Sequence, residues 1–160
     1  QARSVHHSPA RAHPYRVRPH NDDGRMFHPW RALRTLTYVV VVWARPHPTA
    51  PAATDGATVI WLDPRMTQAE RRCALTHELV HLEHGHRGCQ PPAVEHAVRA
   101  AAARQLITLE QLADALPWSM SLDELADELW VTPLVLTDRL AGLTRTEREH
   151  LAALATEHSA

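Results

Sequence analysis

The stretch of this sequence best suited to chemistry is His77-Glu78-Leu79-Val80-His81, in which two histidines lie four residues apart and a glutamate follows the first. On an α-helix, residues i and i+4 lie on one face, so both imidazoles can reach a single ion. Zinc is the expected ion, because it prefers nitrogen ligands in a tetrahedral set and a catalytic zinc leaves its fourth position to water. Glu78 lies about 100° further around the helix, where it can stand beside that water without binding the metal. The pattern therefore predicts the centre of a hydrolase.

The same five-residue pattern also occurs by chance in helices that bind nothing, and the thirteen histidines of this chain raise that chance. Apolar residues flank the motif, however, as a buried helix requires, and polar groups in such surroundings are unusual. These flanking residues are Ala74, Leu75, Leu79, Val80 and Leu82. We therefore interpret the motif as a metal site.

The helix that carries the motif has clear start and stop signals. Thr67 can serve as its N-cap, with Glu70 three residues later completing a capping box. The helix is expected to run to about His84, because Gly85 follows and favours termination. A short helix is also expected over Trp30 to Leu36, whose apolar residues recur at helical spacing.

Two strands are predicted before the metal helix. Tyr38 to Trp43 is a β-branched run that we expect to be a strand buried on both faces. A second strand is expected at Thr58 to Leu62, and a third is allowed for in the loop of residues 45–56, because an isolated pair is marginal in water. Many zinc peptidases hold an extended substrate along the edge of the strand before such a helix. The predicted substrate-binding edge is thus Thr58, Val59, Ile60, Trp61 and Leu62.

The spacing of the remaining residues leaves the third metal ligand open. Cys73 is disfavoured, since three successive turns of a straight helix cannot converge on one ion. The longer pattern H-E-x-x-H-x-x-G-x-x-H also fails, because His84 and Arg87 stand where it needs Gly and His. A carboxylate from the next helix, Ala93 to Ile107, remains, and its first turn bears Glu95. The alternatives are His84, His86 or His96 as ligand, or a solvated Glu95 paired with Arg99.

Residues 77–86 read HELVHLEHGH and residues 95–107 read EHAVRAAAARQLI. This resembles the ImmA/IrrE family of zinc metallopeptidases, whose pattern is H-E-L-x-H-L-x-x-G-H followed by a helix that opens E-x-x-A-x-x-x-A. The departure is Val98, where the family usually has Ala. The resemblance covers roughly residues 30–150 in layout. It implies that Glu95 is the third ligand and that the protein is a cytoplasmic peptidase of bacterial or phage origin that cleaves a repressor encoded nearby.

The composition fits one domain with a small appendage, since 160 residues at 44% hydrophobic content can bury one proper core. The net charge of −1 gives no overall case for nucleic acid or an anionic membrane. Two cysteines, Cys73 and Cys89, are too few for a disulfide framework, which favours a reduced, cytoplasmic setting. No stretch approaches a membrane span. Residues 1–25 contain scattered Pro, His and Arg and are expected to be disordered or a leader, with Met26 as an alternative start.

From Thr108 onward the apolar spacing predicts a bundle of short helices, the last capped by Thr144 with Glu147. Residues 122–140 look like a helix-turn-helix, although Trp130 stands where the turn normally has Gly. The would-be recognition helix, Pro133 to Leu140, offers only Arg139 as a cation. Because phosphate contact needs cations, DNA binding is disfavoured and a packing or partner-docking role is favoured.

Together these features predict an α+β fold with a small sheet packed on the metal helix, followed by a helical bundle. The expected division is a segment at 1–25, a zinc peptidase core at 26–107 and a helical subdomain at 108–160. Glu78 is the expected general base, acting on a protein or peptide substrate. The residue that stabilises the oxyanion is open, with Tyr15, Tyr38, His84, His86 and His96 as candidates. The rival function is a non-catalytic module that docks a transcriptional repressor through its acidic bundle.

Overall fold

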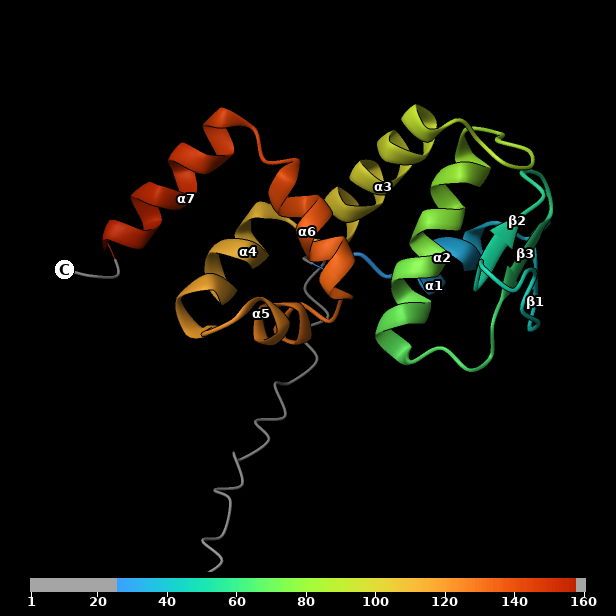
Figure 1. Cartoon of the computed structure of the whole chain (residues 1–160), viewed down its shortest axis with the longest axis horizontal. Coiled ribbons are helices and arrows are strands. Elements are labelled where there is room, and N and C mark those ends of the chain that lie inside the picture. Colours follow the sequence, from blue (N-terminus) through green and yellow to red (C-terminus); the bar gives the residue numbers. More distant parts are fainter. Residues whose placement is uncertain (1–25, 158–160) are drawn as a thin grey trace, which may run out of the picture.

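The computed structural model describes residues 26–157 and places a small β-sheet at one end of the molecule and the last helix at the other (Figure 1). This confirms the α+β class. The segment 1–25 and Tyr15 lie outside the described residues. None of the described helices has the length and apolar character needed to cross a membrane. The elements are α1 (Pro29–Thr35), β1 (Val40–Val42), β2 (Ala52–Thr54), β3 (Val59–Leu62), α2 (Gln68–Glu83), α3 (Pro92–Leu106), α4 (Leu109–Ala115), a 3-10 turn η1 (Leu116–Trp118), α5 (Leu122–Glu128), α6 (Pro133–Ala141) and α7 (Arg145–Glu157).

The sheet has the strand order β1-β3-β2, with β3 parallel to β1 and antiparallel to β2. The third strand allowed for within residues 45–56 is present as β2. The prediction that Thr58 to Leu62 forms a sheet edge is wrong, because β3 has hydrogen-bonded neighbours on both sides. A substrate therefore cannot add to β3, and the free edges belong to β1 and β2.

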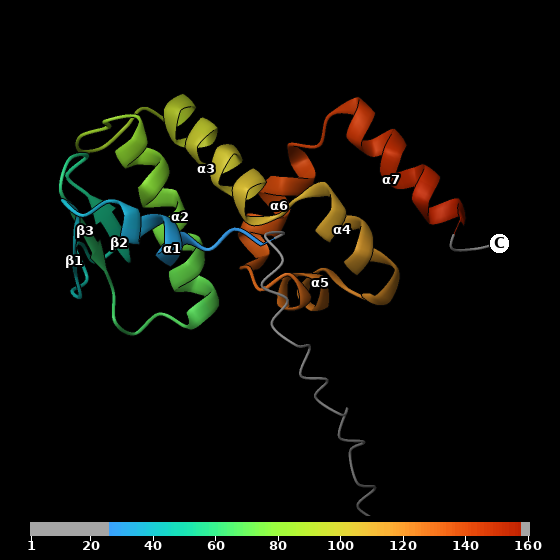
Figure 2. The same cartoon turned by 180° about the vertical axis from the view of Figure 1, so that it is seen from behind.

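The expectation that Tyr38 to Trp43 is buried on both faces is also wrong. Val40 is 60% exposed, whereas Val41 packs against the core with Ile60. The reason is that α1 and α2 contribute the apolar side chains that cover one face of the sheet, and the described elements put no second layer on the other. Seen from behind, α1 lies against α2 beside the sheet (Figure 2).

The metal helix α2 has the predicted ends. The Thr67 hydroxyl accepts from the Glu70 amide at 3.3 Å, and the Glu70 carboxylate accepts from the Thr67 amide at 2.7 Å, which is the expected capping box. At the other end Gly85 adopts φ +65°, the left-handed conformation that ends a helix and suits glycine. Both ends of α2 are therefore confirmed, and both were predicted from residues adjacent to them in the sequence.

Helix α2 is buried on several sides at once. Leu75, Leu79 and Leu82 pack towards the sheet, and Val80 packs on α3. Cys73 belongs to the core of the C-terminal helices. The helix that carries the motif is therefore the element that the sheet, α3 and the C-terminal helices share.

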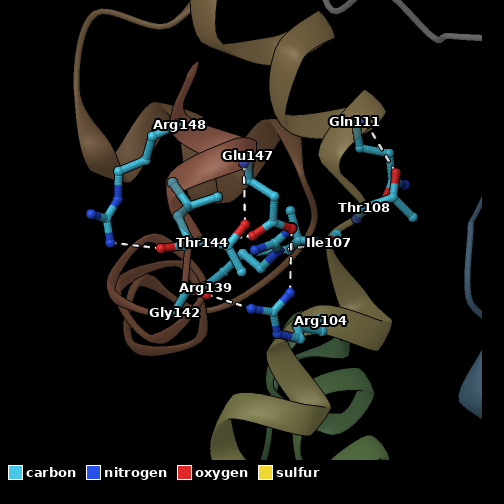
Figure 3. A network of polar contacts seen from close by, with 10 residues as sticks. Arg104, Ile107, Thr108, Gln111, Arg139, Gly142, Thr144, Glu147 and Arg148 are labelled. Carbon is cyan, nitrogen blue, oxygen red and sulfur yellow. Dashed lines mark hydrogen bonds and ion pairs between the residues drawn. The ribbon is translucent and has the colours of Figure 1, made fainter. Parts of the chain in front are cut away.

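The C-terminal helices are held by a buried arginine, as Figure 3 shows. Arg139 on α6 is 3% exposed, and it donates to the Ile107 carbonyl at 2.9 Å and to the Glu147 carboxylate at 2.8 Å. Glu147 also accepts from the Thr144 amide at the start of α7 and pairs with Arg104 of α3. These contacts lower the pKa of Glu147 to about 2, with the Arg139 hydrogen bond as the largest cause.

We expect Glu147→Gln to lower the free energy of unfolding by about 1–3 kcal/mol at pH 7, because the buried Arg139 loses its anionic partner. The carboxylate has a lowered pKa, so its contribution is present above about pH 4.5 and is lost as the pH falls towards 2. Thermal unfolding across this range should show the two proteins converging at acid pH. Glu149→Gln is the control, because Glu149 lies on the same helix in an exposed pair with Arg145 and should have almost no effect. Equal losses for both variants would contradict the assignment.

Candidate metal centre

Three side chains from two helices converge at one point. The Nε2 atoms of His77 and His81 lie 3.0 Å apart, and Oε2 of Glu95 lies 3.4 Å from each. Within residues 26–157 this is the one group of His, Cys, Asp or Glu whose ligand atoms gather in this way, and we call it the ligand cluster. Atoms that bind zinc tetrahedrally at about 2.1 Å lie about 3.4 Å from one another. The cluster therefore fits zinc closely, with the two imidazoles only a few tenths of an ångström too close.

The geometry follows from the packing of α2 against α3. The four-residue spacing places both histidines on one face of α2. Helix α3 opens at Pro92, where proline suits the first turn, and packs on α2 through Val80, Val98 and Ala102. Glu95 lies in this first turn, where the helix dipole also favours a carboxylate. The chain thus brings Glu95 to the histidines from the neighbouring helix.

The alternative in which Glu95 pairs with Arg99 is wrong. Arg99 instead binds Asp138 of α6 through Nε at 2.9 Å and Nη2 at 2.7 Å. This leaves the Glu95 carboxylate directed at the two imidazoles.

The three other histidines considered as ligands lie outside the cluster. His84 contacts the Val80 carbonyl through Nδ1 at 2.8 Å, and His96 is exposed. His86 lies with its Nδ1 3.1 Å from Nδ1 of His81, on the opposite ring nitrogen from the cluster. If His81 binds a metal through Nε2, its Nδ1 carries the proton and donates to His86, which fixes the ring.

Sequence reasoning missed this supporting position of His86, for which the sequence offered no spacing rule. The backbone at His86 packs closely on Gly56, where a Cβ would lie 2.2 Å from the His86 carbonyl oxygen. Gly56 also has φ +73°, so any other residue there is strained as well as obstructed.

Burial sets the charge states at the centre. It is the largest cause of the lowered pKa of both His77 and His81, so both are neutral, which is the form that binds metal. Burial, and then the charge of Glu95, raise the pKa of Glu78 to about 8. Glu78 is therefore a carboxyl that can hold a proton near neutral pH.

A cleft of about 790 Å³ opens beside the cluster. His77 and Glu78 line it on α2, while His81 and Glu95 do not. Residues 49–52, which lead into β2, form one wall in place of the predicted β3 edge, and Thr132 to Asp138 of the helix-turn-helix-like unit contribute another. The proposed oxyanion candidates among the described residues are absent from its lining: Tyr38, His84, His86 and His96.

A family model for the peptidase M78 family, described as the IrrE N-terminal-like domain, matches residues 37–141. The match spans well over half of the chain and includes the ligand cluster and every residue of the cleft. It confirms the resemblance drawn from residues 77–107. Neither a curated protein nor a solved structure matches the chain.

We expect the purified protein to bind about one zinc per chain, because the three ligand atoms are already gathered. Elemental analysis after dialysis should find this zinc in the wild type and lose it in His77→Ala. His96→Ala is the control, since His96 is an exposed histidine next to Glu95 in the chain. Zinc retained in His77→Ala, or lost in both variants, would contradict the expected ligand set.

Glu95→Gln should weaken zinc affinity by tenfold or more, because an amide oxygen replaces a carboxylate. Glu83→Gln changes an exposed glutamate at the end of α2 and should leave the affinity unchanged. Competition with a chromogenic chelator measures both. If the two variants bind zinc equally well, the third ligand lies elsewhere.

Proposed function

The chain belongs to the peptidase M78 family, and on that premise we propose that it is a zinc-dependent metalloendopeptidase with His77, His81 and Glu95 as ligands and Glu78 as general base. The family makes it a protease, whose substrate is a protein or peptide. The observation that carries the proposal is the ligand cluster, with Glu78 buried beside it at the cleft. Zinc bound there would supply Lewis acidity, polarising the scissile carbonyl and acidifying a neighbouring water.

Glu78 has the properties that the proton transfers require. It takes the proton from the attacking water and later gives it to the leaving amine. It lines the cleft but lies outside the ligand cluster, so its carboxylate is available to a substrate. His86 holds the His81 ring through the contact between their Nδ1 atoms.

We further propose that the protein is of bacterial or phage origin and acts in the cytoplasm on a repressor protein, as the family resemblance implies. The burial of Arg139 supports a protein partner over nucleic acid. This arginine is the single cation of α6, and it is turned inward to Ile107 and Glu147. The exposed face of α6 therefore offers no cation to a phosphate backbone.

Glu78→Gln separates catalysis from docking. The variant should keep zinc and fold while losing turnover by several orders of magnitude, because an amide cannot accept the water proton. The measurement is cleavage of a co-expressed repressor, followed by mass, with Glu83→Gln as the active control. A repressor that is bound but left whole by both the wild type and Glu78→Gln would overturn the enzyme and favour the docking module.

A further inference from the structure

The cleft extends beyond Glu78 into a region that the proposed chemistry does not use. This region lies between α2, α3 and α6, and we call it the side pocket. Arg99 and Asp138 stand at its edge. Its lining residues are Cys73, Ala74, Ala102, Thr132, Leu134 and Val135.

The position of Glu78 decides which part of a substrate reaches the side pocket. Ala74 lies one turn before Glu78 on α2, so the two share a face and the cleft runs from the cluster towards the start of the helix. A peptide that passes Glu78 therefore continues over Ala74. Because Glu78 protonates the leaving amine in the proposed mechanism, the residue that carries this amine is the one beside the side pocket.

The side pocket is lined mainly by apolar residues, and two of them, Ala74 and Ala102, are small. Ala74 and Ala102 leave room that larger side chains would fill. The Cys73 thiol already accepts a hydrogen bond from the Thr132 amide at 3.4 Å. On α6, Leu134 is 58% exposed, so a bound apolar side chain would cover apolar surface that now faces water.

The charges at the edge of the side pocket cancel. Asp138 holds Nε and Nη2 of Arg99, which neutralises both groups. An acidic substrate side chain would leave water without meeting an unpaired cation there. Glu70, one turn before Ala74 on α2, also lines the cleft and adds a carboxylate that would repel such a side chain. The pair leaves Nη1 of Arg99 outside its two hydrogen bonds, and this atom can donate to a peptide carbonyl.

We propose that the side pocket binds the side chain of the residue that follows the cleaved bond, and that it selects an apolar side chain of the size of leucine, methionine or phenylalanine over an acidic one. Helix α6 of the helix-turn-helix-like unit then determines specificity as the outer wall of this site. The proposal rests on the proposed peptidase function, since the direction of the substrate follows from the role of Glu78.

The test uses two peptide hydroxamates that chelate zinc and differ only in the group next to the chelator, isobutyl in one and hydrogen in the other. Calorimetry on zinc-loaded Glu78→Gln measures their binding without turnover. We expect the isobutyl compound to bind about tenfold more tightly or better. Equal affinities, or no binding of either compound to the zinc-loaded protein, overturn the proposal.

Two further variants test whether the side pocket causes the preference for the isobutyl compound. Adding Ala74→Leu should fill the pocket and abolish the tenfold preference. Adding Leu134→Ser should reduce it several-fold, and this exposed position should tolerate the change. Leu122→Ser is the control, because Leu122 is 56% exposed on α5 and does not line the cleft. A preference that survives both pocket variants overturns the proposal.

Cleavage of a randomised peptide library by the wild-type zinc protein separates this proposal from the proposed function. Cuts without an apolar preference after the cleaved bond would overturn the side pocket and leave the peptidase standing. A hydroxamate preference without any cleavage would overturn the peptidase and retain the pocket as a binding site.

Discussion

The buried guanidinium of Arg72 is the contact on which the placement of the helices depends. It is 2% exposed on α2 and donates to the carbonyls of Leu106, Leu129, Trp130 and Phe27. Two of these carbonyls lie at the C-terminal ends of α3 and α5, where the helix dipoles favour a cation. A buried charge is costly without partners, so the carbonyls must stay in place around it. Helix α2 is thereby fixed against α3 and against the turn before α6.

This constraint explains why the turn before α6 departs from the usual pattern. Trp130 adopts φ +56°, a left-handed conformation in which glycine is normally preferred. Its ring lies 5.8 Å from the Arg72 guanidinium, and its carbonyl accepts from Arg72 at 2.9 Å. The cation–π contact offsets the backbone strain. The tryptophan therefore has a structural use at this position that glycine could not supply.

The sequence predicts best what local spacing controls. The sequence predicts the capping box of α2, both ends of this helix, and the position of His77 and His81 on one face. The strand order was not, because hydrogen-bond partners depend on distant segments, and β3 proved central although it precedes the metal helix. The family resemblance implies that Glu95 lies beside the two histidines, whereas spacing alone leaves the third ligand open. Only the structure shows that Arg99 is held by Asp138, which leaves Glu95 to the histidines.

Helix α6 illustrates how one local pattern can serve a different end. A helix-turn-helix reads DNA when the recognition helix presents cations and a free face. Here Arg139 is turned into the bundle and Asp138 is bound to Arg99, so the charges of the helix are committed within the protein. The remaining face, with Leu134 and Val135, lines the cleft beside Glu78. The turn at Leu129 and Trp130 that binds Arg72 leads directly into α6, which forms a wall of the cleft, so the contact that fixes α2 also positions this wall of the proposed substrate site.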